Sequence, residues 1–110
     1  MSNLVQVVGS NDFDAATQSG MVLVDFYADW CGPCRRLAPT LEQIAADFEG
    51  RIKIIKVDTV ASQDVAARFR IEHIPTLILF NNGEKIAEFV GAPDDKTLKD
   101  ALEKALGQSD

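Results

Sequence analysis

The chain has 110 residues, of which 46% are hydrophobic and 25% are charged, an ordinary composition for one soluble globular domain. This composition excludes disordered and fibrous classes of protein, and the formal net charge of −6 at pH 7 argues against nucleic acid or an anionic membrane surface as a partner. We expect a single domain over residues 1–110.

We do not expect the N-terminal segment MSNLVQVVGSNDF to be a secretory signal. It lacks both the charged region and the sustained apolar region of a secretory signal. The longest apolar runs in the chain have the length of a strand, which is too short to span a bilayer. Two cysteines are too few for a disulfide framework. We therefore expect a cytoplasmic protein whose thiols are kept mostly reduced.

The first half of the chain alternates between strand and helix patterns. A short strand is predicted over 4–8, and a helix begins at Ser10 and ends at Gly20. Residues 21–28 are apolar on both alternating faces, which is typical of a central strand covered on both sides. A helical stripe and a strand over 52–57 follow, so this region predicts a βαβ unit with parallel strands. The stripe consists of Leu37, Leu41, Ile44, Ala45 and Phe48.

The second half adds a short helix, a β-hairpin and a final helix. The short helix begins at Ser62, and Asn81-Asn82-Gly83 joins a buried strand over 76–80 to a more polar edge strand over 85–90. The final helix is predicted to stop at Gly107. The predicted fold is therefore α/β, with a mixed central sheet of about five strands flanked on both faces by about four helices.

A pair of cysteines stands where the central strand ends and the next helix begins. Cys31 and Cys34 are separated by Gly32 and Pro33. The free N–H groups and the positive dipole end of the helix stabilise a thiolate, so we expect Cys31 to have a lowered pKa and to act as the nucleophile. Cys34 is then placed to attack a mixed disulfide formed at Cys31. Such a pair can carry two electrons between a dithiol and a disulfide.

Two other interpretations of the cysteine pair are weaker. A structural zinc site normally needs four ligands, whereas this chain offers two cysteines and one distant histidine, His73. A permanent structural disulfide would close a loop too small to constrain the unfolded chain much. The βαβ context favours redox chemistry.

The segment WCGPC, residues 30–34, resembles the active site of the thioredoxin family. The likeness extends along nearly the whole chain: it includes VLVDFYADWCGPC, Pro39, Lys56, Ile74-Pro75-Thr76, Asn82-Gly83 and Val90-Gly91-Ala92. It implies the thioredoxin fold, a cis peptide bond before Pro75, and a monomeric general protein-disulfide reductase. The implied partners are disulfide-containing client proteins and a flavin-containing, NADPH-dependent thioredoxin reductase. The resemblance implies no bound cofactor or metal, only a redox-active Cys31–Cys34 disulfide.

We expect the substrate to lie on a flat, weakly apolar platform around the cysteines. An extended client backbone would lie against the segment before Pro75, as in β-augmentation. Core packing is the other explanation for the tryptophan, but an aromatic residue beside a reactive turn favours contact with substrate. The expected platform residues are Trp30, Gly32, Pro33, Ile74, Pro75, Gly91 and Ala92.

The sequence departs from the family pattern at three positions near the predicted site. Tyr27 stands where many relatives have tryptophan, and Arg35 replaces a common lysine. His73 stands where glycine or serine is common. We favour an exposed loop histidine without a catalytic role, and the second interpretation is that His73 adjusts the pKa of Cys31 or the choice of partner.

Asp25 interrupts the most apolar strand of the chain, where an unpaired carboxylate is costly. It could simply pair with Lys56 from the next parallel strand, although a buried ion pair at best breaks even. The functional interpretation is that Asp25 takes a proton from Cys34 when Cys34 attacks the mixed disulfide. Burial should then raise the pKa of Asp25. We assign catalytic roles to Cys31, Cys34, Asp25 and Lys56.

Two other functions remain open on the sequence. The platform could belong to a binding module in which the redox change is incidental, or the chain could be an oxidase or isomerase of the same fold. Gly-Pro between the cysteines resembles the reducing branch of the family, but redox poise also depends on how far the reduced form is stabilised.

Overall fold

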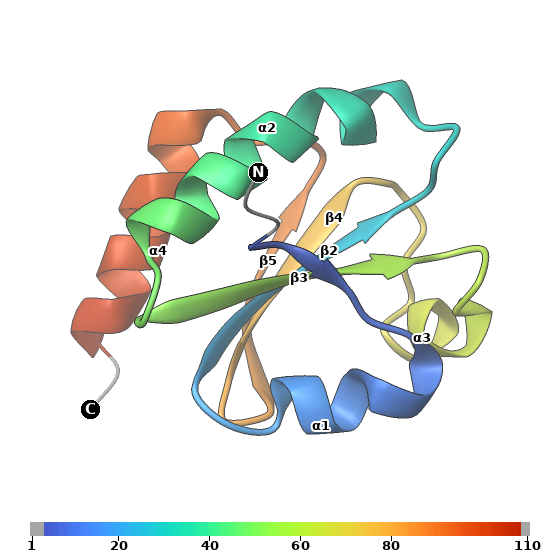
Figure 1. Ribbon diagram of the computed structural model, residues 1–110, viewed down its shortest axis with the longest axis horizontal. Coiled ribbons are helices and arrows are strands. Elements are labelled where there is room, and N and C mark those ends of the chain that lie inside the picture. Colours follow the sequence, from blue (N-terminus) through green and yellow to red (C-terminus); the bar gives the residue numbers. More distant parts are fainter. Residues whose placement is uncertain (1–3, 109–110) are drawn as a thin grey trace.

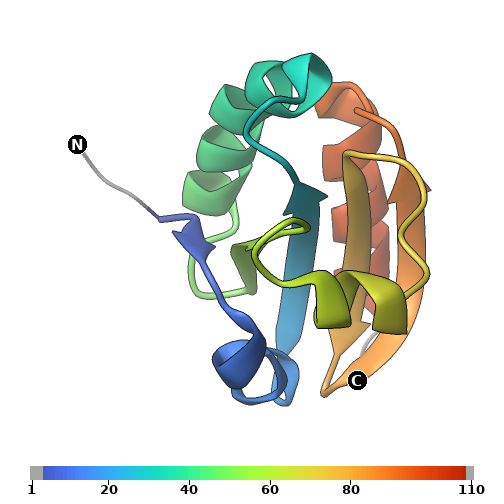
Figure 2. The ribbon, with the colours of Figure 1, turned by 90° about the vertical axis from the view of Figure 1, so that its right-hand side faces the viewer.

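A five-stranded sheet in the order β1-β3-β2-β4-β5 forms the middle of the computed structural model, which describes residues 4–108 (Figure 1). The two edges of the sheet are β1 and β5 (Figure 2). The strands are β1 Gln6–Val7, β2 Met21–Tyr27, β3 Ile52–Asp58, β4 Thr76–Asn81 and β5 Glu84–Val90.

The central position of β2 follows from its sequence. Six of its seven residues are buried, the seventh being the half-buried Tyr27, and a strand covered on both faces has no polar side to present to water. It pairs in parallel with β3 and antiparallel with β4. The predicted βαβ unit and the mixed sheet are both confirmed.

Helices cover both faces of the sheet, as the sequence predicts. One core contains Leu23 and Ile54 of the sheet together with residues of α2 and α4, while the other contains Phe26 and Ile55 with residues of α1 and α3. In Figure 1, α2 and α4 accordingly lie on the opposite side of the sheet from α1 and α3. The helices are η1 Ser10–Asp12, α1 Phe13–Thr17, α2 Gly32–Asp47, α3 Gln63–Arg68 and α4 Asp95–Gln108.

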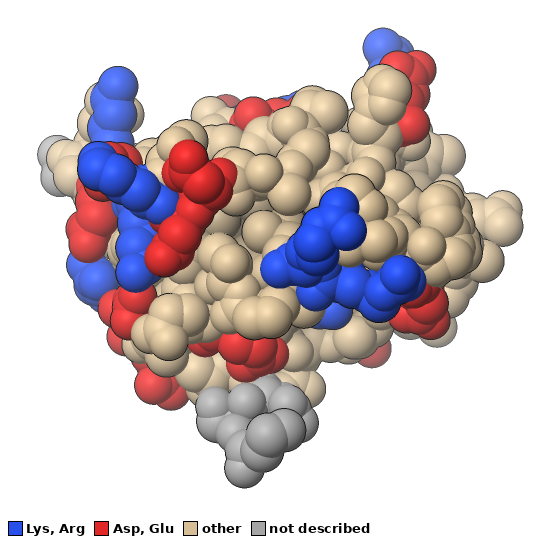
Figure 3. Space-filling model, turned by 90° about the horizontal axis from the view of Figure 1, so that it is seen from above, with Lys and Arg blue, Asp and Glu red and all other residues tan. Residues whose placement is uncertain are grey.

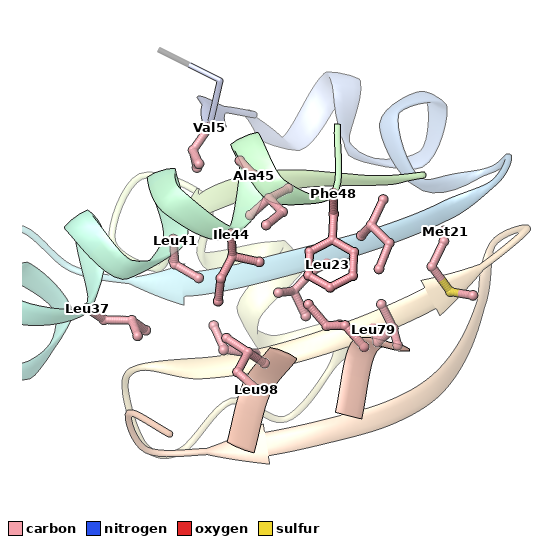
Figure 4. Packing of buried hydrophobic residues seen from close by; sticks show 14 residues of the cluster. Val5, Met21, Leu23, Leu37, Leu41, Ile44, Ala45, Phe48, Leu79 and Leu98 are labelled. Carbon is pink, nitrogen blue, oxygen red and sulfur yellow. The ribbon is translucent and has the colours of Figure 1, made fainter. Parts of the chain in front are cut away.

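The larger core fixes α2 over the sheet. Leu41 and Ile44 of α2 point toward Leu23 of β2 and Leu98 of α4, and all four are at most 1% exposed (Figure 4). Truncating such a side chain to alanine typically costs about 2–5 kcal/mol, because a cavity is left behind. This packing holds the N-terminal end of α2 beside the end of β2.

Several predicted boundaries differ from the structure, and the four longer strands differ from their predicted ranges by a single residue each. The first strand is only Gln6–Val7 instead of 4–8, because both of its residues are exposed and only one partner strand, β3, holds it. The first helix ends at Thr17 rather than at Gly20. The final helix runs through Gly107 to Gln108, because one exposed glycine near a helix end costs too little to stop it.

The hairpin between β4 and β5 turns as predicted. Asn82 and Gly83 both have positive φ, 52° and 85°, which is the backbone that a two-residue type I′ turn requires. The turn returns β5 antiparallel along β4 and brings Val90 opposite Thr76. The end of β5 therefore lies next to the beginning of β4.

Candidate active site

The two cysteines lie at the N-terminus of α2, immediately after β2. Cys31 is the N-cap residue of α2, and its sulfur accepts a hydrogen bond from the backbone N–H of Cys34 at 3.2 Å. The two residues form a disulfide with a Cα–Cα distance of 5.2 Å, within the usual range for such a bridge. Pro33 occupies the first turn of the helix, where its missing N–H leaves no helical bond unmade.

Two segments distant in the sequence meet the cysteine turn. The Ile74–Pro75 peptide bond is cis, as the family resemblance implies. The carbonyl oxygen of Ile74 lies 3.8 Å from the sulfur of Cys31. The N–H of Gly91 donates to the carbonyl of Pro75 at 2.8 Å, so the end of β5 is tied to the same loop. No pattern in the sequence predicts this last bond.

The residues predicted to form a platform have different exposures around Cys31. Trp30 is 71% exposed, which rules out core packing as its role. Pro33 and Ala92 are exposed, whereas Gly32, Ile74 and Gly91 are half-buried and Pro75 is buried. A Cβ added at Gly32 would lie 3.4 Å from the guanidinium of Arg36, so the Arg36 side chain reaches back to the cysteine turn. In the space-filling view from above, the uncharged surface is broken by a few separate groups of charged side chains (Figure 3).

Asp25 is fully buried beneath this end of the sheet. Its side chain is 0% exposed, and within residues 4–108 neither carboxylate oxygen has a hydrogen-bond partner. Lys56 is its register partner on β3, yet no ion pair joins the two side chains in the described part of the chain. Burial raises the pKa of Asp25 to about 7, and the positive charge of Lys56 opposes part of that rise.

The ammonium of Lys56 lies over the ring of Tyr27, 4.4 Å from its centroid. Both residues line a cavity of about 200 Å³ that also reaches Cys34, Asp29 and Arg35. The sequence marks Tyr27 only as a departure from the family pattern, and it does not predict this contact because strand register is not visible in the sequence alone. The pKa of Tyr27 is raised by burial and then by the carboxylates of Asp58, Asp29 and Asp25.

Arg35 and His73 complete the surroundings of the site. The Arg35 guanidinium donates to the carbonyl of Asp29 at 2.8 Å, which fixes it along the edge of the cavity. His73 is exposed in the loop before Pro75, and its backbone carbonyl accepts a hydrogen bond from the Thr76 hydroxyl.

The structure between residues 4 and 108 contains no group of three or more metal-ligating side chains able to hold an ion. No helix of the described chain is long and apolar enough to cross a membrane.

A family model and similar proteins of known name both match this chain, and both point to the same family. The thioredoxin family model matches residues 4–104. A thioredoxin of Staphylococcus aureus is 44% identical over 95 residues, covering 86% of this chain and 91% of the relative. A thioredoxin of Staphylococcus saprophyticus is 45% identical over 103 residues, covering 94% of this chain and 98% of the relative.

Proposed function

The chain belongs to the thioredoxin family and is a thiol–disulfide oxidoreductase, and from that premise we propose that it reduces disulfides in client proteins and is recharged by a flavin-containing, NADPH-dependent thioredoxin reductase. The observation that carries the proposal is the Cys31–Cys34 disulfide at the start of α2, beside the cis-Pro75 loop. A reducing compartment such as the cytoplasm suits this role, since the dithiol must be kept reduced there.

Cys31 is the proposed nucleophile. In the reduced protein its thiolate would keep the Cys34 N–H as a donor and would lie at the positive end of α2, and both effects favour the charged sulfur. The thiolate attacks one sulfur of a client disulfide, so a Cys31–client bond forms, the client S–S bond breaks, and the departing thiolate takes up a proton. The client loses its disulfide in this step, and a mixed disulfide remains.

Cys34 and Asp25 are proposed to complete the reaction. The Cys34 thiol loses its proton to Asp25, directly or through water, and the new thiolate attacks the Cys31 sulfur. The Cys31–Cys34 bond forms, the Cys31–client bond breaks, and the second client sulfur leaves as a thiolate that takes up a proton, so two electrons have passed from this chain to the client. A carboxyl with a pKa of about 7 suits this transfer, since a general base works best near the operating pH.

The client is proposed to lie across the surface formed by the cysteine turn, the Ile74–Pro75 loop and the Gly91–Ala92 segment. The Gly91 to Pro75 hydrogen bond supports this proposal because it holds two of the three segments together. Trp30, at 71% exposed, offers a large apolar contact at the rim, of the kind that aromatic residues supply at interfaces.

Reduction of insulin disulfides tests the proposal. Wild-type protein with dithiothreitol should accelerate the precipitation of insulin chains, and Cys31→Ser should not. If the two proteins gave equal rates, the chain would act only as a binding module. Consumption of NADPH in the presence of a bacterial thioredoxin reductase tests the recharging partner. A reduction potential far more oxidising than that of the glutathione pool would instead favour the oxidase or isomerase alternative.

A further inference from the structure

We propose that Tyr27 is a positioning residue whose ring holds the Lys56 ammonium beside Cys34 and so keeps Lys56 from pairing with Asp25. The contact between Lys56 and Tyr27 does not depend on the proposed function. Its importance for the reaction does, because it rests on the proposed role of Asp25 as proton acceptor. It assigns a task to a residue that differs from the tryptophan common in relatives.

Strand geometry places four polar side chains on one face of the sheet. Asp25 and Tyr27 are two residues apart on β2, so their side chains point the same way. Lys56 lies in register with Asp25 on the neighbouring strand, and Asp58 lies in register with Tyr27. Leu23 and Ile54, two residues before Asp25 and Lys56, belong to the core under α2 and α4. All four polar side chains therefore face the side from which Cys34 approaches.

The position of the Lys56 ammonium is the unexpected feature. Lys56 lies in register with Asp25, whose carboxylate is buried, but neither oxygen of that carboxylate accepts a hydrogen bond within the described residues. The ammonium instead lies 4.4 Å from the Tyr27 centroid, inside the distance at which a ring face attracts a cation. Because a buried ion pair often gains little after desolvation, the half-buried ring of Tyr27 can compete with the fully buried carboxylate of Asp25.

Other charged groups around the cavity favour the same position. Asp29 follows β2 and lines the cavity, and Asp58 ends β3 opposite Tyr27. Both carboxylates, like that of Asp25, lie close enough to raise the pKa of Tyr27, so negative charge surrounds the position that the ammonium takes over the ring. From α2, Cys34 and Arg35 face the cavity, and the Arg35 guanidinium is occupied by the carbonyl of Asp29.

The side of Asp25 toward β4 offers no competing charge. Its register partner there is Leu77, which is fully buried. Lys56 is therefore the cation whose distance decides how strongly Asp25 holds a proton. With Lys56 held at the ring, the proton stays bound up to near-neutral pH. With Lys56 on the carboxylate, Asp25 would be ionised already in acid and would be a poor acceptor for the proton of Cys34.

The test is the titration of the Asp25 carboxyl carbon, followed by NMR in the reduced protein. Tyr27→Phe keeps the ring and should leave the titration midpoint unchanged. Tyr27→Leu removes the ring, frees the ammonium to reach the carboxylate, and should weaken proton binding by about tenfold or more. Tyr27→Met is the second variant if Tyr27→Leu does not fold, with the same expected result. An unchanged or higher midpoint in the variants without a ring, or a lowered one in Tyr27→Phe, would overturn the proposal.

A double variant distinguishes two possible causes of a lowered midpoint: the approach of Lys56 to the carboxylate, and the entry of water into the space left by the ring. In Tyr27→Leu with Lys56→Met the midpoint should return to the wild-type value or above, because no ammonium is left to stabilise the carboxylate. A midpoint that stays low would mean that the lost ring acts through solvation, which also overturns the proposal. Insulin reduction by the same proteins is read separately: a chain with the expected titrations but no reductase activity would refute the proposed function and leave the role of Tyr27 intact.

Discussion

Cys31 and Cys34 have nearly the same exposure, 5% and 4%, so accessibility alone does not decide which of them attacks a client. Their surroundings differ more. The sulfur of Cys31 accepts the helical N–H of Cys34 and lies 3.8 Å from the Ile74 carbonyl, in the loop that the client is proposed to contact. The geometry therefore favours Cys31 for the first attack and Cys34 for the second.

Trapping tests these two roles. Cys34→Ser should accumulate stable mixed disulfides through Cys31, because the resolving thiol is absent, and the trapped proteins would identify the clients. Cys31→Ser should trap at least about tenfold less, since the remaining thiol lacks the stabilisation that lowers its pKa. Mass spectrometry of adducts from matched amounts of the two variants measures the difference. Adducts formed mainly through Cys34 would reverse the assignment.

His73 is the residue for which we predict no catalytic effect. Its side chain is exposed, and none of the hydrogen bonds or ion pairs found among residues 4–108 involves its ring. The loop uses only its backbone carbonyl, which a substitution retains. We expect His73→Ser to leave the thiolate titration of Cys31, followed by absorbance, and the rate of insulin reduction within about twofold of wild type. A displaced titration would support the second interpretation, in which His73 tunes the nucleophile.

At the scale of single elements, the strands and helices with strong patterns were predictable and their ends were not. β2 was predictable as a central strand because its residues are apolar in both alternating positions. α2 was predictable from its stripe, although it begins at Gly32, before the stripe does. The two-residue β1 was overestimated, since a weak edge strand depends on its partner more than on its own sequence.

The parts of the site that depend on the spacing of residues along the chain were predictable. The parts that depend on how neighbouring strands are aligned were not. Cys31 and Cys34 are three residues apart at a strand–helix junction, so their neighbourhood is local. The contact of Lys56 with the Tyr27 ring joins two strands, and no local pattern distinguishes it from a Lys56–Asp25 pair. The Gly91 to Pro75 bond is equally non-local.

The β4–β5 hairpin provides a test at the element scale. Gly83 has a φ of 85°, a backbone angle that residues with a Cβ rarely adopt. An added Cβ would also contact the backbone of Gln18 at 3.6 Å. Gly83→Ala should lower the free energy of unfolding by about 1–2 kcal/mol through backbone strain, measured by urea denaturation. Gly107→Ala is the matched control: its site in α4 has open space, so it should be neutral or stabilising by up to about 1 kcal/mol. Equal effects of the two variants would contradict this explanation.

At the scale of the whole molecule, surface charge contributes little to stability. The ion pairs, such as Arg51–Glu103 and Lys96–Asp100, have side chains roughly half exposed or more, and exposed pairs are worth about 0–1 kcal/mol each. Asp25 is different because it is the one charged side chain found buried among the described residues. The response of the whole fold to pH near neutrality should therefore be dominated by a single carboxyl.

The sign of that response follows from the pKa of Asp25. Burial raises it from 3.8 in a solvated carboxyl to about 7 in the folded protein, so the folded state binds the proton more tightly than the unfolded chain does. Wild-type stability should therefore fall as pH rises between these two values and level off above the higher one. The full cost of ionising the buried group is about 4 kcal/mol, at 1.36 kcal/mol for each tenfold change in proton affinity.

Replacing Asp25 by asparagine should remove this cost and the proton acceptor together. At pH 7–8 the oxidised Asp25→Asn protein should be more stable than wild type by about 1–3 kcal/mol, because the unmet hydrogen bonds of the buried amide offset part of the gain. The difference should shrink toward zero or reverse below about pH 4, where the wild-type carboxyl is protonated in both states. Urea denaturation across this pH range measures it, and Glu49→Gln, which removes an exposed carboxylate, should stay within about 0.5 kcal/mol of wild type at each pH. The same Asp25→Asn protein should reduce insulin about 10–100-fold more slowly, since loss of a general base typically lowers the rate by that factor or more.

Two outcomes would contradict this account of Asp25. A variant that is less stable than wild type at pH 8, or that reduces insulin equally fast, would show that Asp25 interrupts the strand for another reason.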